Sequence, residues 1–270
     1  MKRLTTFGVL FGLVIALAAC GGGGGSTTEN KGADTSAGAP AEKPAESGGA
    51  AVSPVDAATA GSVSGKVSLT GTPPENDAID MSGEADCAKD YTDQPRQETI
   101  LASGGALQNV LVYVKDGLGD MKFPTPKEAV TLDQQGCRYH PHVFGLMTGQ
   151  TLTIVNSDSV LHNIHPKPVV NRPFNVSQPT KGMKADKTFS KAEVPIQIGC
   201  DVHDWMNAYM GVFDHPYYSV SGADGTYKLD NLPPGDYTIV AWQEKLGPQE
   251  QKVTVAAKEA KTADFKFEVK

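Results

Sequence analysis

The sequence lacks an excess of basic residues: 24 Lys and Arg stand against 31 Asp and Glu, for a formal net charge of -7. A nucleic-acid-binding surface needs clustered positive charge, so we expect no nucleic-acid partner. The chain also has no phosphate-binding Gly-Lys-Ser/Thr loop, no Gly-x-Ser-x-Gly elbow and no His-Glu-x-x-His pair. None of these three kinds of catalytic site is therefore predicted.

Aromatic residues are also few, at 7%, and no stretch longer than ten residues keeps a helical period. Short runs rich in β-branched and aromatic residues recur instead between turn signals. These predicted strands are Val110–Val114, Leu152–Val155, Val194–Ile198, Tyr237–Trp242, Val253–Val255 and Phe265–Val269. Many short strands with frequent turns predict an all-β protein, either a sandwich or a Greek-key barrel.

The N-terminus carries an export signal. Lys2 and Arg3 precede an apolar stretch, Phe7–Ala19, that is too short to span a bilayer as a helix. The run that ends at Cys20 resembles the lipobox of bacterial lipoproteins, although an ordinary signal peptide would also fit. The resemblance implies that 1–19 are cleaved, that Cys20 is lipidated, and that the chain is anchored in the bacterial cell envelope. Gly21 after the cysteine favours the outer membrane, facing the periplasm or the cell surface.

Residues 20–60 are predicted to be a tether. Gly, Ala, Pro, Ser and Thr fill 30 of the 40 positions from 21 to 60, and none is aromatic. Such a segment buries too little apolar surface to offset the entropy of ordering it. The folded head is therefore expected at 61–270.

The histidines are unevenly spread. All six lie between His140 and His215. Within this window Cys200, His203 and Met206 follow directly on a predicted strand, and His162 follows another. One thiolate, two imidazoles and one thioether are the donors of a blue copper site, whereas structural zinc is usually held by four Cys or His. His140 and His142 are expected to be solvated.

This window resembles the cupredoxins, and the close Cys-x2-His-x2-Met spacing is most similar to that of amicyanins. The resemblance implies one type 1 copper ion held by four ligands: His162, Cys200, His203 and Met206. Asn163 matches a residue that ties the two ligand loops together, and His165 matches a position that is not a ligand. It also implies electron exit at the edge of His203, beside Trp205 and Tyr209.

A second resemblance lies outside this window. The stretch 223–242, with its Leu-Pro-Pro-Gly-Asp-Tyr run, is similar to carboxypeptidase regulatory-like domains, and Gly61-Ser-Val-Ser-Gly-Lys-Val67 matches the strand that opens them. Because 217–270 is short for a stable sandwich, we expect 61–125 and 217–270 to form one sandwich. The cupredoxin domain, 126–216, would then be an insertion; a tandem order remains the alternative.

Two cysteines remain, Cys87 and Cys137. In an exported protein two spare thiols most plausibly pair, and in the chain-entropy model closing a loop of about 50 residues stabilises the fold by roughly 4 kcal/mol. The bridge would join the two expected domains.

The sequence as a whole predicts a membrane-anchored, exported blue copper protein that transfers single electrons and is not an enzyme. Its partners would be redox proteins such as a c-type cytochrome or another exported redox protein. Two alternatives stay open: a copper-storing or copper-delivering protein, and a metal-free interaction module.

Overall fold

The structure is a computed structural model of the 270-residue chain, and it describes residues 55–269. The predicted signal peptide 1–19, Cys20 and most of the tether lie outside the described residues. No helix among the residues that the structure describes has the length and apolar character needed to cross a membrane.

The regular secondary structure of the described chain is almost entirely strand, which confirms the predicted all-β class. Its one helix, α1, is the four-residue Ala85–Ala88. The six strands predicted from the sequence overlap β4 (Leu111–Asp116), β8 (Leu152–Asn156), β12 (Glu193–Gly199), β16 (Gly235–Gln243), β17 (Gly247–Val255) and β19 (Phe265–Glu268).

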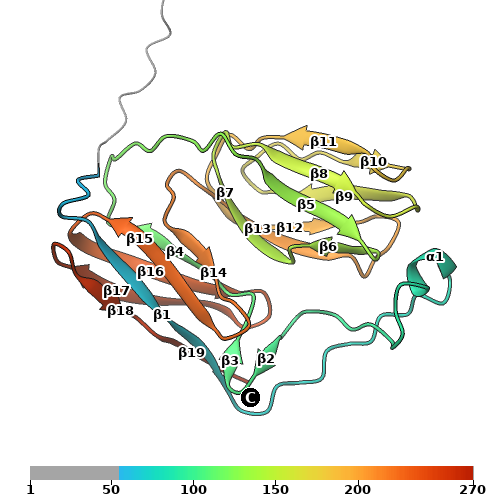
Figure 1. Cartoon of the computed structure of the whole chain (residues 1–270), viewed down its shortest axis with the longest axis horizontal. Coiled ribbons are helices and arrows are strands. Elements are labelled where there is room, and N and C mark those ends of the chain that lie inside the picture. The colour runs from blue at the N-terminus through green and yellow to red at the C-terminus, as the bar shows by residue number, and fades with distance from the viewer. Residues whose placement is uncertain (1–54, 270) are drawn as a thin grey trace, which may run out of the picture. The chain divides into compact units, whose positions relative to one another are not determined.

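Strands from both ends of the described chain form one pair of sheets, which we call the outer sandwich. In the first sheet β1 (Gly61–Thr70) pairs antiparallel with β15 (Thr226–Leu232) and parallel with β18 (Ala260–Thr262) and β19. A short hairpin, β2 (Ala102–Ser103) and β3 (Ala106–Leu107), extends this sheet. The second sheet has the order β14-β4-β16-β17, with β14 at Tyr218–Val220. Figure 1 shows the blue β1 beside the orange and red strands of the C-terminal end.

The outer sandwich has its own core. Val63, Val67 and Leu69 alternate along β1 and are buried against apolar side chains such as Ile239 and Phe265. The glycine in the middle of this strand has a steric reason: a Cβ at Gly65 would collide with the backbone carbonyl of Ala263.

Residues 130–213 form two further sheets, which we call the inner unit. One has the order β10-β9-β12-β13-β7 and the other β11-β8-β5-β6. Two pairings in it, β5–β8 and β13–β7, are parallel, so the inner unit is not a simple meander. The strands not yet given are β5 (Val130–Gln135), β6 (Arg138–His140), β7 (Val143–Met147), β9 (His162–Lys167), β10 (Val176–Gln178), β11 (Lys184–Lys187) and β13 (Asn207–Phe213).

A third apolar cluster joins the outer sandwich to the inner unit. Its buried members are Leu111, Val143, Phe213, Val240 and Trp242. His142 lies at the same junction, where its Nε2 is 2.5 Å from Oε1 of Glu244 and its side chain is only 5% exposed. The expectation of a solvated His142 is therefore wrong, because β16 of the outer sandwich leads directly into the Glu244 that covers it.

Between β1 and β2 the chain leaves the outer sandwich and packs on the inner unit. Ile79, Met81 and Cys87 of this excursion belong to the inner unit's core cluster. We call residues 79–97 the cap; α1, teal in Figure 1, lies within it.

Candidate metal centre

The pairing of β9 with β12 brings two loops of the inner unit together. His165 of β9 is opposite Gly199, the last residue of β12. His162 opens β9, and Cys200 follows β12 directly, so both residues lie at the same end of adjacent strands. His203 and Met206 belong to the short loop that joins β12 to β13.

Three of the four predicted ligands form one buried group. The candidate donor atoms of His162, Cys200 and His203 all lie within 4.8 Å of one another. Nδ1 of His162 is 3.0 Å from Nδ1 of His203, which in turn is 3.8 Å from Sγ of Cys200. All three side chains are buried. A thiolate and two imidazole nitrogens that face one another at these distances suit a small, soft or borderline metal ion such as copper.

Met206 closes the loop that also carries two other predicted ligands, Cys200 and His203. Its backbone N–H donates to the carbonyl of His203, and its own carbonyl accepts a hydrogen bond from the N–H of Cys200. Met206 is buried in the same core cluster as Cys200, with Trp205 packed against that cluster. The backbone thus holds the Cys-x2-His-x2-Met segment as one tight turn.

Asn163 links the two ligand loops, as its resemblance predicts. Its Oδ1 accepts the backbone N–H of Asp201 at 2.7 Å and lies 3.2 Å from Sγ of Cys200. Its Nδ2 donates to Asn175 and Asp201. These contacts fix the position of the thiol relative to β9.

The environment of Cys200 favours its thiolate form. Burial raises the pKa of the thiol, but hydrogen bonds from the side chains of His162 and His203 and from backbone N–H groups outweigh it, and the pKa falls to about 5. A thiol with this pKa is ionised at neutral pH, which is the form that binds metals.

Asp158 orients His162 through a contact with Nε2 of its ring. Its Oδ2 lies 2.9 Å from Nε2 of His162, on the side of the ring opposite Cys200. Burial works against the charged form of each group, but their mutual hydrogen bond and charges dominate, so the pKa of Asp158 is lowered and that of His162 is raised. A carboxylate on the far nitrogen is a common support for a metal-binding histidine.

The same carboxylate anchors the turn that contains Cys137. Gly136 and Cys137 connect β5 to β6, and both have positive φ, 61° and 55°, as a two-residue hairpin turn requires. Asp158 accepts the backbone N–H of both residues, each at 2.8 Å. Cys137 therefore holds a backbone conformation that is uncommon for a residue other than glycine.

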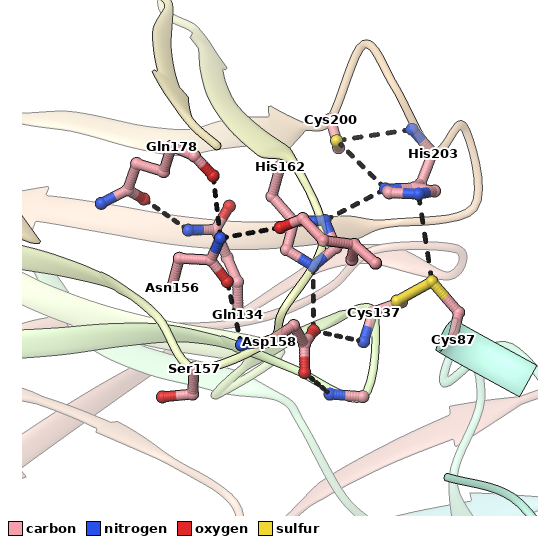
Figure 2. A network of polar contacts seen from close by, with 12 residues as sticks. Cys87, Gln134, Cys137, Asn156, Ser157, Asp158, His162, Gln178, Cys200 and His203 are labelled. Atoms are coloured by element: carbon pink, nitrogen blue, oxygen red, sulfur yellow. Dashed lines mark hydrogen bonds and ion pairs between the residues drawn. A yellow bond between two sulfur atoms is a disulfide. The ribbon is translucent and has the colours of Figure 1, made fainter. Parts of the chain in front are cut away.

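A disulfide joins Cys137 to Cys87 of the cap. Both of its ends lie in the core of the inner unit, so it fastens the cap to this unit, and the expectation that it joins two domains needs that correction. Sγ of Cys87 is 3.9 Å from Nε2 of His203 (Figure 2). His203 is only 2% exposed. The disulfide therefore covers the edge of His203 that the resemblance gives as the electron exit, and that exit stays a prediction.

Two aromatic residues expected beside this exit have other neighbours. The Trp205 indole lies 5.0 Å from the His203 ring and donates its N–H to the carbonyl of Cys137. Tyr209 packs instead on Trp242 of the outer sandwich. Of these two, only Trp205 contacts the ligand group.

A buried amide network supports the loop before His162. Asn156 donates to the carbonyls of Val160 and Gln178 and accepts the N–H of Asp158. Gln178 in turn accepts from Gln134 on β5 (Figure 2). These bonds fix Asp158 on a loop that has no regular structure of its own, directly before His162 opens β9.

Sequence reasoning assigned no role to Asp158 and did not foresee the cap. Asp158 did carry a local signal, since it precedes His162 by four residues in a turn-forming Asn-Ser-Asp-Ser run. For the cap, only the predicted pairing of Cys87 with Cys137 gave a signal. Its contact with His203 gave none, because it joins residues 116 positions apart.

One known protein family matches part of the chain. The family model of the carboxypeptidase regulatory-like domain matches residues 212–268, which include the C-terminal strands of the outer sandwich. No curated protein is similar enough to the chain to count as a match.

Solved structures similar to the chain include several copper proteins. A Cu-containing nitrite reductase from Thermus scotoductus SA-01 is 21% identical over 36% of this chain, which spans only 25% of that enzyme, with a TM-score of 0.30. A purple cupredoxin from Nitrosopumilus maritimus is 23% identical over 31% of this chain and 98% of its own, with a TM-score of 0.27. A Cu(I) amicyanin variant is 22% identical over 31% of this chain and 81% of its own, with a TM-score of 0.28. At these TM-scores, the argument for a metal rests on the donor atoms described above.

Proposed function

We propose that this protein is an exported, lipid-anchored copper protein that transfers single electrons and catalyses no reaction of its own. The observation that carries the proposal is the buried group of His162, Cys200 and His203, whose donor atoms lie within 4.8 Å of one another. Met206 would be the fourth ligand. The copper ion would be of type 1 and would alternate between Cu(I) and Cu(II).

The donor set supports copper over structural zinc. Structural zinc sites usually take four Cys or His ligands, whereas a thiolate, two imidazoles and a weak thioether suit both oxidation states of copper. The lowered pKa of Cys200 keeps the thiolate available at neutral pH. Because the chain itself would supply all the ligands and all are buried, substrate access to the metal would be restricted, which favours electron transfer over catalysis.

The proposal extends to domain boundaries and location. The inner unit would be a cupredoxin domain, residues 126–216, inserted into a carboxypeptidase regulatory-like sandwich of residues 61–125 and 217–270, with the cap as the part of 61–125 that packs on the cupredoxin domain instead. Lipidated Cys20 and the tether would place this head at the outer membrane, facing the periplasm or the cell surface. Its partner would be another exported redox protein, such as a c-type cytochrome.

The test is to add Cu(II) to the full-length chain and record its visible spectrum. A type 1 site gives an intense thiolate-to-copper charge-transfer band, and Cys200→Ser must abolish it. His162→Gln and His165→Gln form a matched pair on β9, and only the first should lose the band. A pale spectrum from the unaltered chain, or a band that survives Cys200→Ser, would contradict the proposal.

A copper-delivery protein would give the same absorption band, but it would exchange its copper ion at a different rate. An electron-transfer site should cycle reversibly at an electrode and release copper slowly to a chelator, because its ligands are buried. Rapid release without reversible cycling would favour delivery.

A further inference from the structure

A second group of ligand-type atoms lies directly behind the first. One candidate donor atom from each of Cys137, Asp158 and His162 lies within 4.8 Å of the other two. On the same side, Nε2 of His203 faces Sγ of Cys87 at 3.9 Å. The disulfide therefore lies beside Asp158 and near the imidazoles of His162 and His203, as Figure 2 shows.

The sulfur pair can bind metal only when it is reduced. As a disulfide, Cys87 and Cys137 are poor ligands, but as thiolates they form a soft pair of the kind that selects Cu(I). We propose that Cys87 and Cys137 form a second, reduction-dependent site for one Cu(I) ion, supported by Asp158. This inference rests on the proposed function, because it takes copper as the metal that the protein handles.

A dithiol reductant supplies the electrons and protons that reduction of the disulfide requires. A dithiol reductant gives two electrons and two protons to the bond between Cys87 and Cys137 and is itself oxidised to a cyclic disulfide. The two thiols then lose their protons to solvent as they bind the Cu(I) ion.

The surroundings of the disulfide differ from those of a simple cross-link. A cross-link needs no charged neighbour, yet the buried Asp158 accepts the N–H of both turn residues on the Cys137 side. These bonds keep Cys137 at a φ of 55°. A carboxylate held by several hydrogen bonds is already placed to support a cation before any metal arrives.

The surface beside this place is hollowed, although neither cysteine lines the hollow. A polar pocket of about 490 Å³ is lined by Asp158 and by the residues next to each cysteine, Asp86 and Gly136. Its wall also includes Asp90 and His140. The disulfide itself is buried, so the cap must open locally before a reductant can reach it.

On the Cys87 side of the bridge, the local secondary structure is short. Cys87 belongs to α1, which has only four residues and no side-chain hydrogen bond at its N-cap. Helices this short have little stability of their own, so core packing and the disulfide hold Cys87 in place. Once the disulfide is reduced, one of these two constraints is removed and local opening becomes easier.

The experiment counts Cu(I) in the full-length chain. The chain is prepared anaerobically with the disulfide intact or reduced by excess dithiothreitol, the reductant is removed, and thiols are counted. Each form is then titrated with Cu(I) against a chromophoric chelator. The oxidised chain should withdraw one Cu(I) and the reduced chain two, a twofold rise in uptake.

Two controls test whether the second Cu(I) ion binds at Cys87 and Cys137. The Cys87→Ser/Cys137→Ser double variant should take up one Cu(I) under both conditions; because it could fold poorly, reduced wild-type chain alkylated at the two new thiols serves as an independent control. The Cys200→Ser variant lacks the thiolate of the first site, so Cu(I)-thiolate absorption in the ultraviolet should appear in it only after reduction.

Equal uptake before and after reduction would overturn the inference, as would a disulfide that stays closed in the folded chain under excess reductant. An absence of blue colour in the oxidised chain with Cu(II) would instead overturn the proposed function, so the two failures are distinguishable.

Discussion

Nε2 of His203 lies 3.9 Å from Sγ of Cys87, a residue 116 positions earlier in the chain. This contact places a disulfide where the resemblance to cupredoxins led us to expect an exposed ligand edge. The first prediction concerns what that disulfide does for stability.

Replacing both cysteines, in the Cys87→Ser/Cys137→Ser variant, should lower the free energy of unfolding by about 4 kcal/mol, because the bridge closes a loop with a sequence separation of 50. Denaturant unfolding of the metal-free chain without reductant measures this change. The Cys200→Ser variant is the matched control, since it removes a cysteine and no cross-link. A loss below about 1 kcal/mol in the double variant would contradict a stabilising role.

The second prediction concerns Asp158. In Asp158→Asn one of the two acceptor oxygens is replaced by a donor. The side chain then loses either the hydrogen bond from Gly136 or its contacts with Cys137 and His162. Loss of such a supporting carboxylate typically lowers metal affinity 10- to 100-fold. Competition for copper against a chelator measures it. Asp230→Asn, an exposed change on the outer sandwich, should leave the affinity unaltered; an equal loss in both variants would show that the effect is not local.

The third prediction compares two asparagines of one network. Asn163→Ala should destabilise the fold by about 1 to 3 kcal/mol, because it leaves the Asp201 N–H and neighbouring polar groups without their partner beside the buried Cys200. Asn175 is exposed, so Asn175→Ala should cost less than about 1 kcal/mol. Denaturant midpoints of the two variants decide the order, and similar losses would mean that burial is not the cause.

The fourth prediction is a pH dependence from His215. Burial lowers its pKa to about 4, and its Nδ1 accepts the N–H of Tyr217, which requires the neutral ring. An unfolded histidine has a pKa near 6.5, so between these values the unfolded chain binds more protons. The stability contributed by neutral His215 is thus present above about pH 6.5 and is lost as pH falls toward 4, by up to about 3 kcal/mol.

Unfolding free energies of the unaltered chain and His215→Phe, measured between pH 4 and 7.5, test this. As pH falls, the stability of His215→Phe should decrease less than that of the unaltered chain, because the variant has no imidazole at this position to take up a proton. If both chains show the same pH profile, another group is responsible.

The strands and the first ligand group were predictable because their signals are local. Alternating Ile196 and Ile198 mark a strand with one buried face, and that strand delivers Cys200 to its end. The spacing of the predicted ligands within seven residues can likewise be read directly from the sequence. His162 could be added because it too follows a strand.

Burial across the junction and under the cap was not predictable. His142 has the same local pattern as an exposed histidine, and residues distant in the sequence, among them Glu244 and Tyr209, bury it. The cap's contact with His203 is equally non-local. Asp158 lies between these cases: its position in the sequence was visible, but its role depends on a turn at Gly136 and Cys137 that comes from another strand pair.

The pairing of β1 with strands from the far end of the chain has a consequence for folding order. The Ser68 hydroxyl donates to the carbonyl of Phe265, 197 residues later, whereas residues 130–213 form both sheets of the inner unit from one continuous segment. Contacts between distant residues form slowly, and chains emerge from synthesis N-terminus first. The first of the described strands to emerge is therefore among the last to find its partners, and the outer sandwich closes after the inner unit can already be complete.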